Sequence, residues 1–158
     1  MGVSLARILL VDDTCVEWKL ALSSPGDDAL IEQITLVKDE DEALDFLYER
    51  GPFDRRVPGL PAVVVLGPKL RSSAALAVLK SIRGDVALRR VPVVVCEAGS
   101  DEQTARSAYD HRANSLVCTH GDVRIRAGQY AALTRFWGRV NEPPPGSMPR
   151  ADRRRSGS

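Results

Sequence analysis

The 158-residue chain has few cysteines and no long apolar run. Its three cysteines, Cys15, Cys96 and Cys118, are an odd number at wide spacing, which excludes a disulfide framework and is typical of a reducing compartment. No window approaches the roughly 18 consecutive apolar residues of a membrane helix, and "MGVSLARILLVDD" reaches acidic residues before a signal peptide could form. We therefore expect a cytoplasmic protein without a membrane segment.

The sequence also lacks an excess of charge of one sign. It holds 22 Lys and Arg against 21 Asp and Glu, a formal net charge of +1, which gives no field to attract nucleic acid or an acidic membrane. The first apolar run is followed by "DDTCVE" rather than a glycine-rich phosphate loop, and no G-x-S-x-G motif appears. These absences argue against nucleotide-binding and hydrolase classes.

What the chain does contain is an alternation of apolar runs with amphipathic segments. Buried strands are predicted at 7–13, 33–37, 62–66, 91–96 and 115–118. A first helix is predicted at 14–22, with a Thr14–Glu17 capping box, and a second from Asp39 to Gly51. A third contains Leu76, Leu79 and Ile82 and ends near Gly84, and a fourth runs from a Ser100–Gln103 cap through Arg112. A last helix carries the stripe Leu133, Phe136, Trp137 and Val140, which we expect to be core.

Five strands alternating with five helices predict an α/β fold with a doubly wound, five-stranded parallel sheet of the flavodoxin-like order 2-1-3-4-5. We expect one domain over residues 5–140. Residues 141–158 are rich in Pro, Gly, Ser and Arg, which predicts a disordered tail. Its Arg153, Arg154 and Arg155 form either a solvated run or a contact with an acidic partner.

The segments "ILLVDD", "EALDFLYERGPF", "RRVPVVVC" and "LTRFWGRV" appear in this order along the chain. From about Arg7 to Trp137 the sequence resembles a response-regulator receiver domain of the CheY-like kind, especially the single-domain regulators that partner phytochrome-type histidine kinases. The resemblance implies an aspartyl phosphate with Mg²⁺, held by an acidic pair after the first strand. It also implies a phosphoacceptor Asp after the third strand, a hydroxyl after the fourth, and a Lys and an aromatic switch residue at the fifth.

Only the acidic pair is retained, as Asp12 and Asp13. The phosphoacceptor position falls on Gly67, which offers no atom to phosphorylate, and "AVVVLGPKL" holds no carboxylate beside it. Glu97 stands at the hydroxyl position, Thr119 at the lysine position and Leu116 at the switch position. We therefore predict a non-enzymatic pseudo-receiver without a cofactor, in which Mg²⁺ binding is doubtful and Asp13 is a weak metal candidate.

Several alternatives remain for the former phosphorylation pocket. The Lys69 ammonium could lie between Asp13 and Glu97 and replace the metal, or it could be a solvated loop lysine. Phosphorylation could use Ser72, Ser73 or Asp13 instead. A ligand- or metal-sensing variant could use the acidic edge with Cys15, Cys96, Cys118 and His120, although this spacing matches no standard zinc pattern.

An interaction face is implied by the same resemblance, on the fourth helix, the fifth strand and the fifth helix. The candidates in this sequence are Arg106, Tyr109, Arg112, Arg126 and Tyr130, expected to be exposed. The partner implied is a protein, either a sensor histidine kinase, another regulator or a second copy of the chain.

Overall fold

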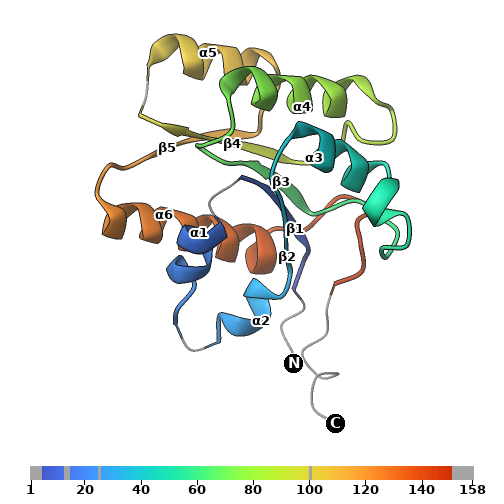
Figure 1. Ribbon diagram of the computed structural model, residues 1–158, viewed down its shortest axis with the longest axis horizontal. Coiled ribbons are helices and arrows are strands. Elements are labelled where there is room, and N and C mark those ends of the chain that lie inside the picture. Colours follow the sequence, from blue (N-terminus) through green and yellow to red (C-terminus); the bar gives the residue numbers. More distant parts are fainter. Residues whose placement is uncertain (1–4, 13–14, 25, 100, 151–158) are drawn as a thin grey trace.

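The computed structural model describes residues 5–12, 15–24, 26–99 and 101–150, without the side chains of residues 15, 16 and 19. A five-stranded parallel sheet in the order β2-β1-β3-β4-β5 forms its centre (Figure 1). The strands are β1 (Ile8–Val11), β2 (Ile34–Val37), β3 (Val63–Leu66), β4 (Val93–Ala98) and β5 (Ser115–Thr119). The predicted fold class and strand order are confirmed.

Helices cover both faces of the sheet (Figure 1). On one face lie α3 (Glu40–Leu47), α4 (Ser72–Gly84) and α5 (Glu102–Asp110), and on the other lie α1 (Cys15–Ala21), α2 (Asp28–Ile31) and α6 (Val123–Arg135). The five predicted helices are present. The additional helix α2 has only four residues, too few to show a helical period in the sequence.

The sheet has a separate core on each face because side chains alternate along its strands. Leu9 and Val11 of β1 pack on the α3/α4 side, whereas Ile8 and Leu10 pack on the α1/α6 side. All four residues of β1 and of β3 are buried, as the continuous apolar runs predict.

Two predicted helix starts can be checked by their caps. The Asp39 carboxylate accepts a hydrogen bond from the Glu42 backbone N at 2.9 Å, as predicted. Helix α5 is capped by Asp101, one residue after the predicted Ser100, because the Asp101 carboxylate accepts a hydrogen bond from the Thr104 backbone N at 2.7 Å. The expected caps Thr14 and Ser100 lie outside the described residues.

The predicted apolar stripe of the last helix is only partly core. Leu133 is buried, but Phe136 is 45% exposed and Val140 is 72% exposed. The reason is a change of helix type, because α6 ends at Arg135 and residues 136–140 form a π-helix, in which the Asn141 backbone N donates to the Phe136 carbonyl at 2.8 Å. The wider turn shifts the side chains that follow it off the buried face.

The expected boundary at residue 140 is also wrong for the described part of the tail. The Met148 backbone N donates to the Leu60 carbonyl at 2.7 Å, and the Leu60 N donates to the Gly146 carbonyl at 3.0 Å. The Met148 side chain is buried and joins the core on the α3/α4 side. Residues 141–150 therefore pack on the domain, because this single large apolar side chain and its backbone hydrogen bonds fix them; residues 151–158 are not described.

An ion pair between a buried Asp27 and a partly exposed Arg135 joins the segment before α2 to the end of α6. The Asp27 side chain is 3% exposed, and the Arg135 Nη2 lies 2.8 Å from its Oδ2. Hydrogen bonding from Arg135 outweighs burial and lowers the pKa of Asp27 below its usual value of 3.8. The pair therefore contributes stability above pH 3.8 that is lost as the pH falls through the lowered pKa.

We expect Asp27→Asn to lower the free energy of unfolding by about 2 kcal/mol at neutral pH. Urea unfolding should show that the difference from the wild type narrows as the pH falls below 3.8 and disappears below the lowered pKa, where the carboxylate is neutral in the folded wild type as well. The neighbouring Asp28→Asn is the control, since Asp28 is exposed. An equal loss in both variants would contradict the assignment.

Candidate functional site

The ends of β1 and β3 lie side by side at the predicted phosphorylation site. Val11 is paired with Leu66, and the Gly67 backbone N donates to the Val11 carbonyl at 2.8 Å, so Asp12 and Gly67 are neighbours beyond the last strand pair. A Cβ added to Gly67 would overlap the Cβ, Cγ and Oδ2 atoms of Asp12. The Asp12 side chain therefore fills the space that a side chain at position 67 would need.

Asp12 belongs to the α1/α6 side of the sheet. Asp12 is 1% exposed. The burial of Cys96 is the main cause that raises the pKa of its thiol to about 12, and the negative charge of Asp12 raises it further. It also contributes to raising the pKa of the Tyr130 phenol, where burial is again the main cause. Both groups pack in the core beneath α1 and α6. Asp13 lies outside the described residues.

Glu97 lies on the opposite side of the sheet, between α4 and α5. It extends from the end of β4, half-buried, and accepts a 3.5 Å hydrogen bond from the Ser72 hydroxyl. Burial is the main cause that raises the pKa of Glu97. The predicted acidic pocket is thus divided, because the alternation along the strands turns Asp12 and Glu97 to different faces.

The predicted position of Lys69 between Asp13 and Glu97 involves Asp13, which lies outside the described residues. Lys69 is exposed on the loop after β3, and none of the ion pairs among the described residues includes it. Remaining solvated costs a lysine less than entering a low-dielectric pocket. This exposure favours the solvated alternative for Lys69.

The positions carried over to β5 hold no charged group. Thr119 is buried, and its hydroxyl donates to the Glu97 carbonyl at 3.0 Å, which ties the end of β5 to β4. Leu116 packs against the core on the α4/α5 side, and its backbone N donates to the Tyr109 hydroxyl at 3.4 Å. These two side chains act in packing and strand pairing.

The cysteines do not assemble a metal site in the described part of the chain. No group of three His, Cys, Asp or Glu side chains there could hold a metal ion. Cys96 is buried with a raised pKa, which is typical of an inert thiol, and the His120 Nδ1 accepts from the Asp122 backbone N at 2.9 Å. The side chain of Cys15 is not described.

Of the residues predicted for an interaction face, those on and just after α5 are exposed, whereas Arg126 and Tyr130 on α6 are not. Arg106, Tyr109 and Arg112 are exposed on α5 and the residues just after it. Arg126 turns instead toward α1, where its Nε lies 3.3 Å from Glu17 Oε2. Tyr130 is 1% exposed, so its assignment to this face is wrong; it lies on the side of α6 that packs on α1 and the sheet.

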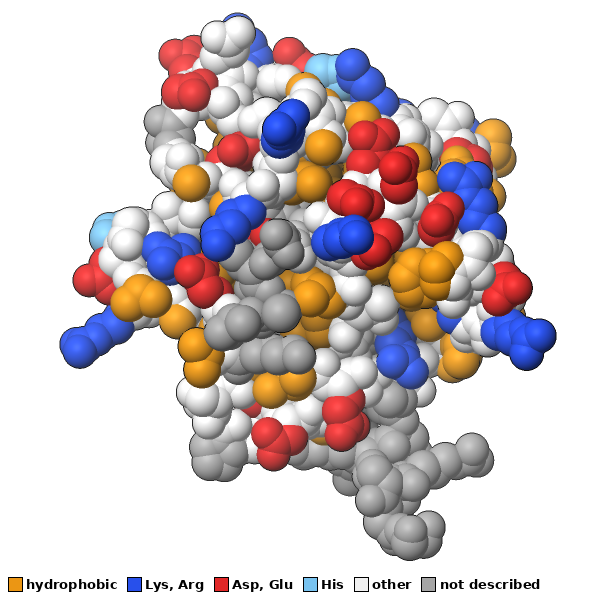
Figure 2. Space-filling model, viewed as in Figure 1, with side chains coloured by type: hydrophobic (Ala, Val, Ile, Leu, Met, Phe, Trp, Pro, Cys, Tyr) orange, Lys and Arg blue, Asp and Glu red, His pale blue; other side chains and the backbone are white. Residues whose placement is uncertain are grey.

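Charged side chains of both signs lie on the face shown in Figure 2. Figure 2 shows acidic side chains gathered over α3, whose first turn holds Glu40, Asp41 and Glu42, while basic side chains are scattered over this face. Carboxylates at a helix N-terminus are stabilised by the helix dipole, which accounts for the acidic group. Within the described residues, no helix is long and apolar enough to cross a membrane.

Two features of the site are not predicted from the sequence. The closeness of Asp12 to Gly67 depends on the register between β1 and β3. The space beside Glu97 depends on how α4 and α5 pack, although the small residues Ser72, Ala75, Ser107 and Ala108 on these helices are a signal that could have indicated it.

Comparisons with known proteins place the chain in one family, although no family model matches it. The bacteriophytochrome response regulator RtBRR is 33% identical, with 90% of this chain and 86% of that chain covered and a TM-score of 0.61. Response regulator Rcp1 of Synechocystis sp. is 22% identical over 82% of this chain and 87% of its own length. The Mn²⁺-bound form of Rcp1 shares the fold with a TM-score of 0.72 at 20% identity, over 88% of this chain and 99% of that chain. The chain therefore belongs to the response regulator receiver domains of two-component systems and is related to the phytochrome response regulators.

Proposed function

We propose that this receiver domain is a pseudo-receiver, which signals through protein contacts without phosphorylation of an aspartate and without catalytic activity of its own. The observation that carries the proposal is the packing of Asp12 against Gly67. Position 67 has no carboxylate, and its side-chain space is already filled. A phosphoryl group would have neither an attachment point nor room there.

The polar surroundings support the same proposal. A phosphoryl group is dianionic, and Glu97 would repel it where a hydroxyl donor is expected. Thr119 carries no positive charge, and its hydroxyl already donates to the Glu97 carbonyl. The cations that follow β3 in sequence, Lys69 and Arg71, are exposed, and no ion pair among the described residues includes either of them.

The described residues of this site, which do not include Asp13, do not fit a Mg²⁺ ion. Mg²⁺ requires octahedral oxygen ligands, commonly one or two carboxylates with phosphate oxygens and water. Asp12 is buried against Gly67, Gly67 offers no side-chain ligand, and Glu97 lies on the other side of the sheet. We derive no step through a metal ion for this chain.

Phosphorylation at Ser72 or Ser73 is the alternative. Both hydroxyls are exposed at the start of α4, where a helix N-terminus favours an anion. Ser72, however, donates to Glu97, and a phosphate there would face that carboxylate. This contact supports the pseudo-receiver.

We expect no incorporation of label when the chain is incubated with radiolabelled acetyl phosphate and magnesium. The measurement is the bound radioactivity after gel separation, compared with an active receiver as positive control. Label that is lost in acid as well as in base would indicate an acyl phosphate, as at Asp13, and would overturn the proposal. Label that survives acid, is lost in strong base and disappears in Ser72→Ala would establish the serine alternative.

The partner that we propose is a bacteriophytochrome histidine kinase, supported by the similarity to RtBRR. The exposed side chains of α5 form the proposed contact face, because Tyr109 is 54% exposed and lies one turn from Arg106. Aromatic and arginine side chains carry most of the binding energy in such contacts.

Replacing both Arg106 and Tyr109 with alanine is expected to weaken binding to that kinase about tenfold. Isothermal titration calorimetry measures the change, and Arg89→Ala, at an exposed position outside this face, is the control. Unchanged affinity in the double variant would show that the kinase contacts another surface.

A further inference from the structure

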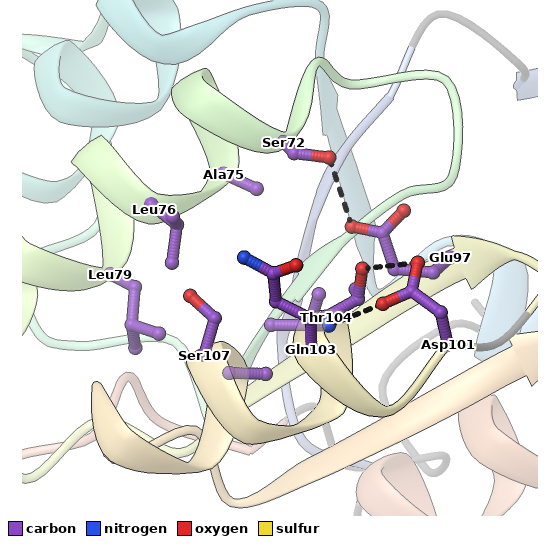
Figure 3. A pocket seen from close by; sticks show the side chains of 11 residues that line it. Ser72, Ala75, Leu76, Leu79, Glu97, Asp101, Gln103, Thr104 and Ser107 are labelled. Atoms are coloured by element: carbon purple, nitrogen blue, oxygen red, sulfur yellow. Dashed lines mark hydrogen bonds between the residues drawn. The ribbon is translucent and has the colours of Figure 1, made fainter.

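A cavity of about 250 Å³ lies between α4 and α5, above the end of β4 (Figure 3). Small side chains create it. Ala75 of α4 faces Ser107 and Ala108 of α5 across the space, and these three are too short to fill it. The full lining is Ser72, Ala75, Leu76, Leu79, Val95, Glu97, Asp101, Gln103, Thr104, Ser107 and Ala108.

The two ends of the cavity differ in chemistry. At one end, the carboxylates of Glu97 and Asp101 lie close to the hydroxyls of Ser72 and Thr104 (Figure 3). At the other end lie Leu76 and Leu79, and the Gln103 amide lies between the two ends (Figure 3). Such a combination of an apolar wall with a few convergent polar groups is typical of a small-molecule site.

The polar end of the cavity carries negative charge. No Lys, Arg or His is among the described residues that line the cavity. Asp101 stays ionised, because both its oxygens accept hydrogen bonds, from the Thr104 backbone N at 2.7 Å and from the Thr104 hydroxyl at 3.0 Å. Among the described residues, the Glu97 carboxylate accepts a hydrogen bond only from the Ser72 hydroxyl, at 3.5 Å. A positive group placed between these carboxylates would relieve their repulsion and replace the solvation that the half-buried Glu97 has lost, while Asp101 stays exposed to solvent.

We propose that this cavity binds a small organic ammonium ion, with its ammonium group between Glu97 and Asp101 and its apolar body against Leu76 and Leu79. A cavity of roughly 150 Å³ accommodates benzene. The larger cavity here, of about 250 Å³, therefore holds a molecule of about ten non-hydrogen atoms. A bare metal ion would leave the apolar end unfilled, and an anion would meet two carboxylates. The site goes beyond the proposed function, because it requires neither phosphorylation nor a protein partner.

The test compares three probes that share a phenyl ring on a short chain and differ in charge: phenethylamine, phenethyl alcohol and hydrocinnamate. Each is titrated into the full-length ¹⁵N-labelled chain, and backbone amide shifts are followed by NMR. We expect phenethylamine to shift amides of α4 and α5 around the cavity, with an affinity at least about tenfold above that of the alcohol. Hydrocinnamate should cause no saturable shift.

Variants separate this site from non-specific attraction of an amine to acidic residues. Glu97→Gln keeps the size of the side chain and should lower the affinity for phenethylamine about tenfold, to that of the alcohol. Glu102→Gln removes the same charge from α5 at a side chain that is 85% exposed and outside the lining, and it should leave the affinity unchanged. Ser107→Leu should fill the cavity and abolish binding of both probes.

The proposal fails if the amine and the alcohol bind equally, if Glu97→Gln and Glu102→Gln weaken the amine alike, or if no amide around the cavity shifts with amine up to about 10 mM. A dispersed spectrum of Ser107→Leu that still reports amine binding would also overturn it. None of these outcomes depends on phosphorylation, so the inference and the proposed function can fail separately.

Discussion

Gly67→Ala is expected to lower the free energy of unfolding by about 3 kcal/mol. The added Cβ would overlap Asp12 at Oδ2, Cγ and Cβ, and rotation of the Asp12 side chain about χ1 cannot remove the overlap with its Cβ. The ends of β1 and β3 must therefore move apart, which strains the hydrogen bond from the Gly67 N to the Val11 carbonyl. Chemical denaturation with urea measures the loss.

Gly128→Ala is the control for this variant. Gly128 lies inside α6, and an added Cβ there meets nothing within 4 Å. The substitution should raise the free energy of unfolding by about 1 kcal/mol, because alanine favours the helix. The two variants add the same methyl group. A loss of stability in Gly67→Ala together with a gain in Gly128→Ala would therefore show that the loss comes from the close approach at Gly67.

A double-mutant cycle with Asp12 tests the cause of the loss. In an Asp12→Gly background, the atoms that the new Cβ would overlap are gone, and Gly67→Ala should then cost less than about 1 kcal/mol. An equal loss in both backgrounds would show that Asp12 is not the obstacle. The same overlap means that Gly67→Asp alone should not restore a phosphoacceptor.

The sequence predicts the fold well because each of its signals is local. Continuous β-branched runs such as "AVVVL" indicate strands buried on both faces, and the alternation with helices then leaves few topologies. The helix caps at Asp39 and near Asp101 are local signals of the same kind. The π-helix after Arg135 has no such signal, and therefore the predicted stripe fails at Phe136 and Val140.

The candidate site is predicted less well because it depends on relations between strands. The absence of a carboxylate at Gly67 is visible in the sequence, but the burial of Asp12 against it is not. A period of two places Asp12 on the face of Leu10 and Glu97 on the face of Val95. Only the register of β1, β3 and β4 shows that these faces are opposite, and that Glu97 opens onto a cavity instead of joining Asp12.

Tyr130→Ala is expected to lower the free energy of unfolding by about 4 kcal/mol. Tyr130 stacks on Trp18 with ring centroids 4.1 Å apart and an interplanar angle of 18°, and both side chains are almost fully buried between α1, α6 and the sheet. Position 130 is three residues before the buried Leu133, so it lies on the same side of α6. Truncation would leave a cavity beneath α1.

Tyr130→Phe separates packing from the hydroxyl. The Tyr130 hydroxyl is buried and has no hydrogen-bond partner among the described residues, so its removal should leave stability unchanged or raise it by about 1 kcal/mol. Tyr109→Ala, at a side chain that is 54% exposed, should change stability by less than about 0.5 kcal/mol. If Tyr130→Ala were as mild as Tyr109→Ala, Tyr130 would be a surface residue and could rejoin the interaction face. A large loss of stability in Tyr130→Ala without a loss in Tyr109→Ala would instead limit the interaction face to α5 and its surroundings. The side of α6 that packs on α1 would then belong to the core of the domain.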